Sequence, residues 1–250
     1  MKDYLHQYCL RIGDNSVILS HRLAEYSSYG PFLEEDLAIT NVALDLLGQA
    51  EGFIKYASEI EAQGKSVDDI VYRRNENEYL NCQLVEYPNE DFAYVCARQF
   101  FIDVYNYFLY TELSNSSDDT LAALAAKSLK EVSYHLNRST DWILRLGNGT
   151  EESHKKLQNA VDNLWMYTGE LFEMDEVETN LLKEGISADN KIIRKLWLHK
   201  VKELFDEAGL HCPEGEYAVT GGRKGVHTEK MGFILTEMQF LPRNYPEAIW

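Results

Sequence analysis

Residues 117–146, SDDTLAALAAKSLKEVSYHLNRSTDWILRL, are the stretch of sequence that decides the fold. Ser116 or Ser117 can accept a hydrogen bond from the first free backbone amides of a helix, and the two aspartates that follow suit the positive end of its dipole. Helix-forming residues dominate the next eleven positions, and Gly147 and Gly149 tolerate a left-handed cap at the other end. The pattern therefore predicts one long helix.

This helix is expected to bury a histidine on its inward face. Positions that step by four and three share one face of a helix. The residues on that face are Leu121, Ala125, Ser128, Val132, His135, Ser139, Trp142 and Leu146. His135 lies in the middle of this stripe, and Glu131 lies one turn earlier at its flank. What His135 contacts is therefore the main question about function.

The rest of the chain also favours helices, because strand patterns are weak throughout. The first helix has Gly13-Asp-Asn15 as the point where it could break, and Pro242 is expected to end the last one. Residues 65–89 and the glycine-rich stretch 212–227 are expected to be irregular. Helices are expected at 3–29, 32–63, 90–113, 150–172, 175–184, 189–208 and 228–241. We predict an all-α, ferritin-like bundle in a single domain, 1–250, with a core at about 3–172 and further helices and a glycine-rich loop at about 173–250.

Composition narrows the function classes. The formal net charge of −17 argues against nucleic acid or an anionic membrane as a partner, because both would be repelled. No apolar run approaches the ~20 residues that span a bilayer, and the first residues lack the apolar stretch of a signal peptide. The four cysteines are scattered without a CxxC pair, so neither a disulfide framework nor a zinc site is indicated. We expect a cytoplasmic protein.

Two incomplete ligand frames point to the chemistry of carboxylate-bridged diiron bundles. Such proteins use one Glu from each of two helices and a Glu-x-x-His pair from each of the other two. The second expected helix has Asp45 with Gly48 where the histidine belongs. The long helix has His135 with Val132 where the acid belongs. Asp103 on the third helix matches the place of a lone acidic ligand.

The residues alone leave two interpretations of these frames. In the first, Glu131 replaces Val132, and Glu25, Asp45, Gln49 and Asp103 complete a metal site with His135. In the second, the same side chains form a buried polar cluster without metal, since buried charges need partners. Two irons usually require about six protein ligands, so the polar cluster is the preferred interpretation. No metal is expected in this chain.

A basic glycine-rich segment, Gly221–Gly225 (GGRKG), is a weaker candidate. It matches neither a P-loop nor a GxGxxG turn after a strand. A surface hairpin is the simpler interpretation, and a contact to a partner or an anionic ligand is the alternative.

Several stretches together resemble a known family. LEEDLAITNVALDLLGQA (33–50), KEVSYHL (130–136) and TGGRKGVHTE (220–229) are the most distinctive. Four shorter stretches also match: 89–93, 146–150, 164–172 and 237–241. The chain is similar, over nearly its whole length, to the structural C subunits of bacterial phenylacetyl-CoA 1,2-epoxidases in the ferritin-like superfamily.

The resemblance implies a place in a multicomponent monooxygenase of aerobic phenylacetate breakdown, which adds one oxygen atom of O₂ to the aromatic ring as an epoxide. In that family a homologous catalytic subunit holds the diiron centre and binds phenylacetyl-CoA. The C-type chain pairs with it and stabilises it without iron of its own. A separate reductase with NADPH, flavin and an iron-sulfur cluster supplies electrons. The resemblance therefore assigns no catalytic or cofactor-binding residue to this chain.

Two hypotheses follow. The first is a non-catalytic structural subunit of that epoxidase. The second is an autonomous metal-dependent oxygenase or hydrolase that uses the degraded carboxylate and histidine site. The iron content of the purified chain distinguishes them.

Overall fold

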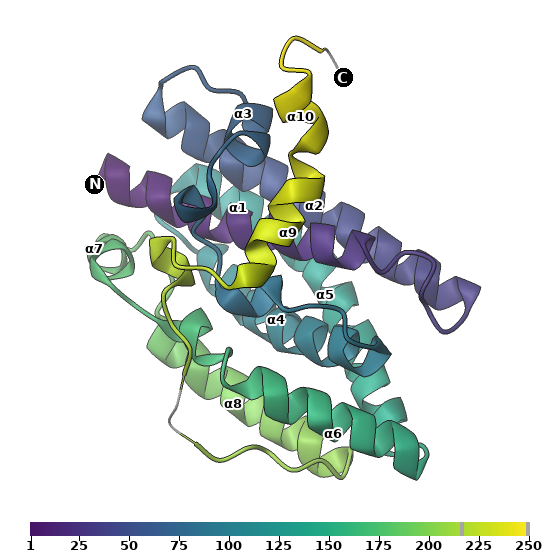
Figure 1. The fold of residues 1–250 in the computed structure, drawn as a ribbon. Helices are drawn as coiled ribbons and strands as arrows, with labels where there is room; N and C mark the ends of the chain where they lie inside the picture. Colours follow the sequence, from purple (N-terminus) through teal and green to yellow (C-terminus); the bar gives the residue numbers. More distant parts are fainter. Residues whose placement is uncertain (216–217, 249–250) are drawn as a thin grey trace. The chain divides into compact units, whose positions relative to one another are not determined.

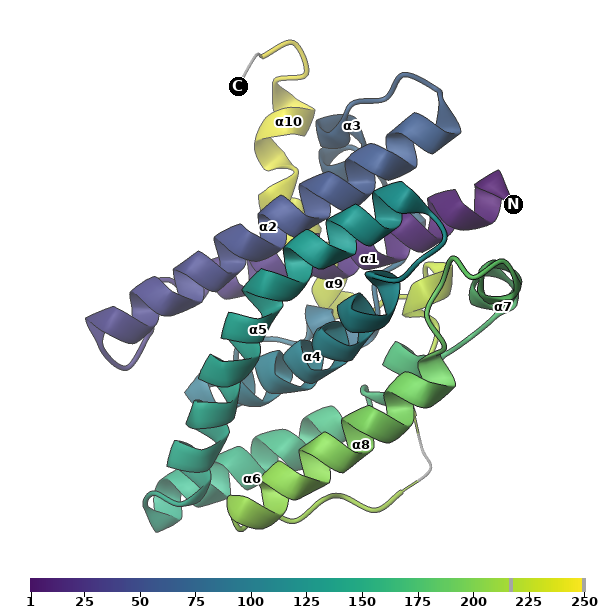
Figure 2. The same cartoon turned by 180° about the vertical axis from the view of Figure 1, so that it is seen from behind.

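The structure, a computed structural model, describes residues 1–215 and 218–248, and the regular elements in that range are all helical (Figures 1 and 2). Residues 216–217 of the expected glycine-rich excursion lie outside the described part. The α-helices are α1 (Lys2–Ala24), α2 (Leu33–Glu61), α3 (Val67–Tyr72), α4 (Phe92–Leu113), α5 (Asp119–Gly147), α6 (Glu151–Trp165), α7 (Glu176–Lys183), α8 (Asn190–Glu207), α9 (Glu229–Met238) and α10 (Phe240–Asn244). The 3-10 helices are η1 (Glu76–Glu78), η2 (Gln83–Glu86), η3 (Gly169–Phe172) and η4 (Gly222–Lys224). The all-α prediction is confirmed.

The helices form two compact units. The first unit comprises residues 1–88 and 220–250, and the second comprises residues 89–219. The chain therefore leaves the first unit after Pro88 and returns to it at Thr220. The core bundle expected at about 3–172 would combine helices of both units. That these helices form one bundle stays a prediction.

The first unit is built on the hairpin of α1 and α2, which lie side by side (Figure 1). A Cβ atom at Gly13 would lie 2.5 Å from Cγ1 of Ile54, so the absence of a side chain at this position lets the two helices approach closely. The expected break at Gly13-Asp-Asn15 is therefore wrong, and α1 is continuous there. The polar neighbours are satisfied by residues far along the chain. Asp14 accepts the backbone N–H of Leu80 at 2.8 Å, and Asn15 accepts that of Cys82 at 2.8 Å.

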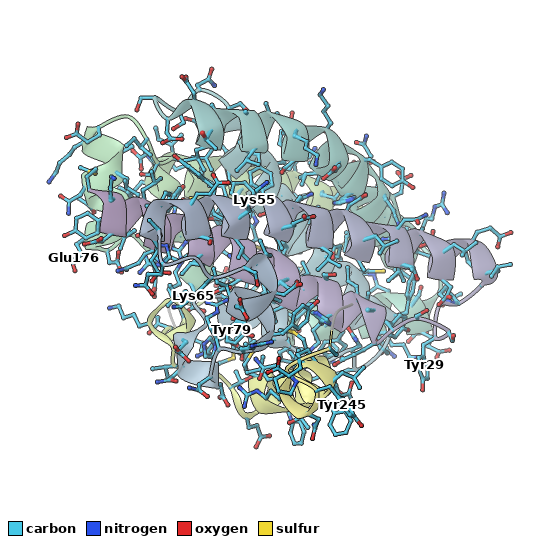
Figure 3. All side chains as sticks on the ribbon, turned by 90° about the horizontal axis from the view of Figure 1, so that it is seen from above. Tyr29, Lys55, Lys65, Tyr79, Glu176 and Tyr245 are labelled. Carbon is cyan, nitrogen blue, oxygen red and sulfur yellow. The ribbon has the colours of Figure 1, made fainter. Side chains whose placement is uncertain are left out.

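The first helix ends at Ala24 rather than near residue 29, because the turn before α2 is closed by a side chain. The carboxylate of Asp36 accepts the backbone N–H groups of Ser28, at 2.6 Å, and Gly30, at 3.2 Å. Ser28 has a φ of 78°, which a continuing helix excludes. Figure 3 shows Tyr29 in this turn, at one end of the hairpin.

The last helices also differ from the sequence expectation. The expected helix at 228–241 is two helices, α9 and α10, separated at Gln239. Pro242 lies inside α10 rather than after it. It is tolerated because it occupies the first turn, where backbone N–H groups have no helical acceptor in any case.

The second unit has α4 at its centre, as its nearly continuous apolar sequence predicts. It packs against α5, α6 and α8. The aromatic cluster of this unit is centred on Trp197, which is 1% exposed. Its ring lies 5.6 Å from the rings of Phe101 and Trp165 and 5.4 Å from that of Phe172. Its indole N–H donates to the carbonyl of Phe101 at 2.9 Å.

The start of α5 corrects one detail of the predicted capping. The N-cap is Asp118, whose carboxylate accepts the N–H of Leu121 at 2.8 Å. Ser116 and Ser117 do not cap the helix. Their hydroxyls instead donate to the carbonyls of Ile186 and Glu184, at 2.7 and 2.8 Å. The turn after α7 therefore supplies acceptors that the sequence around residue 117 does not reveal.

The helix after Thr150 is shorter than expected. Thr150 forms the predicted N-cap, with Ser153 as its reciprocal partner. The helix α6 ends at Trp165, and after a turn the 3-10 helix η3 covers Gly169–Phe172. The stretch 150–172 is thus helical in two pieces.

We predict that Trp197→Ala lowers the free energy of unfolding by about 3–5 kcal/mol, because it empties the centre of the aromatic cluster. Its neighbour Leu196, which is 40% exposed, provides the control. Leu196→Ala should change stability by about 0.5 kcal/mol or less. Urea unfolding followed by far-ultraviolet circular dichroism measures both. An equal decrease in the free energy of unfolding for the two variants would contradict the placement of Trp197 at the centre of the core.

Candidate functional site

Two residues of the predicted polar cluster, Asp103 and His135, lie together within the second unit, between α4 and α5. Asp103 and His135 are each 1% exposed. Oδ1 of Asp103 accepts the side-chain N–H of Gln99 at 2.7 Å. Burial raises the pKa of Asp103 from its ordinary value of 3.8 to about 6, although His135, Ser139, Gln99 and Arg138 all act in the opposite direction. The cluster therefore surrounds one carboxyl group with imidazole, hydroxyl, amide and guanidinium groups.

The inward face of α5 buries His135, as predicted. Near the end of the helix, the buried positions differ from the predicted ones. Positions 121, 125, 128, 132, 135 and 139 are all buried. Beyond them, Ile143 and Gly147 are buried in place of the expected Trp142 and Leu146. A repeat of alternating three and four residues drifts from the 3.6-residue turn of a straight helix. Trp142 instead packs edge-on against Phe92, with ring centroids 4.8 Å apart.

The donors of this cluster do not fit a diiron centre. Val132, where an acidic ligand would stand, is fully buried, and Glu131 lies half-buried beside it. Asp103 and His135 thus remain as the buried acid and imidazole of the cluster, with the cation of Arg138 acting on the carboxyl group. A permanent positive charge disfavours a dication at the same carboxylate. Among residues 1–215 and 218–248, no three His, Cys, Asp or Glu side chains are placed to share a metal ion.

The other three residues of the predicted set belong to the first unit. Glu25 is the residue that follows α1, and its two carboxylate oxygens accept from Nη1 of Arg22 at 3.0 and 2.7 Å. On α2, Asp45 is half-buried and Gln49 is buried. Gly48 is exposed, and a Cβ there would meet no atom within 4 Å. A diiron bundle would have a ligand histidine at position 48. In this structure, that position lies on the exposed side of α2.

A second buried cluster, in the first unit, was missed by the sequence analysis. Its centre is the carboxylate of Glu86, a fully buried residue. One oxygen accepts from Nδ1 of His227 at 2.5 Å and from the amide of Asn81 at 3.0 Å. The other accepts the backbone N–H and the hydroxyl of Thr228, at 2.9 and 2.7 Å. This carboxylate therefore joins the first and last parts of the unit.

His227 is held as an imidazolium by this arrangement. Its second ring nitrogen lies 2.9 Å from the carbonyl of Tyr79, which can only accept. Both ring nitrogens therefore donate, and this requires the protonated ring. Burial lowers the pKa of His227, but the hydrogen bond and charge of Glu86 outweigh burial, so the pKa lies above its ordinary 6.5. Glu86 lies 141 residues away in the sequence, so spacing could not reveal the pair.

A neighbouring network ties the same segments to α1. The guanidinium of Arg74 pairs with the fully buried carboxylate of Asp14 and lies 4.2 Å above the ring of Tyr79. The hydroxyl of Tyr79 donates to the carbonyl of Val71 and accepts from the side chain of Gln239 at 2.9 Å. Residues 65–88, α1 and α9 are therefore connected by polar groups as well as by apolar packing. Figure 3 labels Tyr79 within this part of the first unit.

The glycine-rich segment is not a surface hairpin. Gly222–Lys224 form the 3-10 helix η4, and Arg223 is 5% exposed. A Cβ at Gly225 would lie 2.2 Å from the carbonyl oxygen of Asn77, so only glycine fits this close approach. The segment therefore positions His227 and Thr228 beside Glu86, and whether it also binds a partner or an anion stays untested.

Comparisons with known proteins agree with one another. The family profile described as "Phenylacetic acid catabolic protein" matches residues 1–250. The chain is 46% identical, over 246 residues, to the C subunit of the 1,2-phenylacetyl-CoA epoxidase of Escherichia coli (strain K12), and the match covers 98% of this chain and 99% of that protein. Within the described part of the chain, the helices are too short or too polar to cross a membrane.

We predict that His227→Gln lowers the free energy of unfolding by about 3 kcal/mol near pH 6, because glutamine cannot carry the charge that balances Glu86. The folded pKa is raised, so this stabilisation is complete below 6.5 and declines as the pH rises through the folded pKa. The difference in the free energy of unfolding between wild type and variant should become smaller from about pH 6 to about pH 9.5. Urea unfolding at several pH values measures it, with the exposed His199→Gln as control. A gap independent of pH would contradict an imidazolium.

A second pH dependence is expected at Asp103, whose folded pKa is also raised. The folded pKa of about 6 lies above the ordinary 3.8, so the folded state binds the proton more tightly. The contribution to stability is present below 3.8 and is lost as the pH rises through 6. Asparagine imitates the protonated acid. The free energy of unfolding of Asp103→Asn should therefore rise, relative to that of wild type, by up to about 3 kcal/mol between about pH 4 and pH 7.5. Asp141→Asn, on the exposed side of α5, should show no such trend in the same unfolding experiment.

Proposed function

The chain belongs to the phenylacetic acid catabolic protein family, and we propose that it is the non-catalytic structural subunit of a phenylacetyl-CoA 1,2-epoxidase. In this proposal it pairs in the cytoplasm with a homologous catalytic subunit that carries the diiron centre and binds phenylacetyl-CoA. A reductase with NADPH, flavin and iron-sulfur groups supplies the electrons. The observation that carries the proposal is the near full-length similarity to the C subunit of the bacterial enzyme.

The chemistry of the buried clusters supports a structural role. Asp103 and His135 are accompanied by the cation of Arg138, and Glu86 by the imidazolium of His227. Each carboxyl group thus has protein cations or hydrogen-bond donors in contact with it. Such clusters contribute specificity and stability to a packed interior. They leave little negative charge for a metal ion.

The net charge of −17 supports a dependence on a partner. A chain this acidic repels its own copies, so a stable complex requires a partner of complementary charge. A structural subunit whose role is to stabilise a less acidic catalytic subunit meets that requirement. Its single-domain, ferritin-like organisation is part of the same proposal.

The experiment is reconstitution with the catalytic subunit and the reductase, followed by NADPH oxidation that depends on phenylacetyl-CoA. We expect co-expressed chains to elute as one heteromer, and the isolated chain to hold less than about 0.2 iron per chain. His135→Leu should lower the melting temperature by about 2–8 °C. Turnover per assembled heteromer should stay within about threefold of wild type, because chemistry occurs in the other subunit.

Two outcomes would overturn the proposal. Separate elution of the two chains at micromolar concentration would exclude pairing. Nearly two irons per isolated chain, with a loss of turnover of about a hundredfold in His135→Leu at an unchanged melting temperature, would establish an autonomous metal enzyme. His199→Leu, at an exposed position of α8, is the matched control for both measurements.

A further inference from the structure

The helix α2 has a second apolar face, which is exposed. Leu33, Leu37, Leu44 and Leu47 are 70, 54, 60 and 37% exposed. Their spacing of four, seven and three residues places them in one stripe along the helix. Tyr29 and Phe32, in the turn before the helix, extend the stripe and are 72 and 48% exposed. Figure 3 shows Tyr29 at this end of the hairpin.

The stripe is separate from the face that builds the core. Ile39, Leu46, Ala50 and Phe53 are each 1% exposed or less, and they form the buried side of α2. The helix is therefore apolar on two sides, of which one is buried within the unit and the other is largely exposed. Exposed leucines that share one face of a helix are typical of a surface that another protein covers.

A hollow at the end of the stripe has the form of a docking pocket. A cavity of about 390 Å³ is lined by Leu44, Leu47, Gly48 and Glu51 of α2 and by residues of α3. The residues from α3 and α1 in its wall are Val67, Asp68, Val71, Tyr72 and Val17. Because Gly48 has no side chain and faces open space, a side chain of another helix can enter beside it. Flanking leucines and a small residue are what a packed helix-helix contact requires.

The charge around the stripe identifies the kind of partner. Residues 33–54 carry Glu34, Glu35, Asp36, Asp45 and Glu51 and have no lysine, arginine or histidine. The first base on α2 is Lys55, which Figure 3 labels. A second copy would bring the exposed Glu34 and Glu51 to the contact again, and the chains already carry a charge of −17 each. A partner with basic residues at the contact is attracted instead.

We propose that the exposed face of α2, formed by Leu33, Leu37, Leu44 and Leu47, docks a helix of the partner subunit whose apolar stripe is flanked by lysine or arginine. A side chain of that helix enters the hollow at Gly48, and its basic residues face Glu34 and Glu51. This inference rests on the proposed function, because it names the surface through which the two subunits pair.

The test compares two double variants of the full chain in binding to the purified catalytic subunit. Leu44→Asp with Leu47→Asp places charges in the stripe beside the hollow. Ile192→Asp with Leu196→Asp makes the same change on α8, where the side chains are 48 and 40% exposed. We expect the α2 variant to weaken the dissociation constant by about a hundredfold or more, and the α8 variant by threefold or less. Isothermal titration calorimetry measures both.

A charge variant tests the partner's chemistry independently of the leucines. Glu34→Lys with Glu51→Lys keeps the stripe and reverses two exposed charges. We expect binding about tenfold weaker, with much of the salt dependence of the association rate lost. Both positions are exposed on a helix, so we expect this variant to fold normally. Its affinity can therefore be measured even if the aspartates in the stripe lower the melting temperature of the other variant.

The outcomes separate this inference from the proposed function. If the wild-type chain fails to bind the catalytic subunit, both proposals are overturned. If wild type binds and the α2 variants bind within threefold of it, or the α8 variant loses as much affinity, the docking surface is wrong and the proposed function stands. If the isolated wild-type chain is a dimer that the α2 aspartates dissociate, the occupant is a second copy and the basic partner helix is excluded.

Discussion

A buried carboxylate cannot stay ionised without donors, and the first unit is arranged around this constraint at Glu86. Its donors come from Asn81, His227 and Thr228, and the last two lie beyond the whole second unit in the sequence. Removing one partner of such a buried pair costs several kcal/mol, because the remaining charge is left without compensation. The return of the chain at Thr220 is therefore required for the stability of residues 65–88, and the network of Asp14, Arg74 and Gln239 reinforces it.

The two buried clusters compensate the cost of burying a carboxyl group in different ways. In the first unit, Glu86 is fully paired and raises the pKa of its histidine. In the second, burial dominates at Asp103 and raises the pKa of the acid itself to about 6. One cluster joins distant segments through a charge pair, and the other keeps a polar contact between two adjacent helices. Neither arrangement combines a set of negative donors with an open position, which metal catalysis requires.

The aromatic rings of the second unit surround Trp197, whose indole N–H donates to the carbonyl of Phe101. Leu33, Leu37 and Leu44 of α2, by contrast, are more than half exposed. The acidic composition of the chain then favours a basic neighbour over a second copy. Charge, exposure and family membership are thus consistent with a protein that supports chemistry carried out in another chain.

The sequence alone was sufficient for the features that depend on neighbours along the chain. Periodicity predicted the long helix at 117–146, the burial of His135 on its inward face and the central position of α4, because a helix repeats every 3.6 residues whatever surrounds it. The ligand pattern of diiron bundles also suggested Asp103 as a companion of His135, and the structure places the two residues in the same cluster. The ends of helices were less certain, since Asp36, Ile186 and Glu184 supply capping groups from elsewhere.

Only the tertiary structure decided the partners of residues that are far apart. Glu86 and His227 are 141 positions apart, and Gly13 and Gly225 are required by approaches to Ile54 and Asn77. The glycine-rich segment was expected at the surface as a hairpin, yet Arg223 is buried. Local patterns cannot predict such pairings, because a charge or a glycine in the sequence is compatible with many partners. Folding selects among them by which contacts satisfy every buried polar group at once.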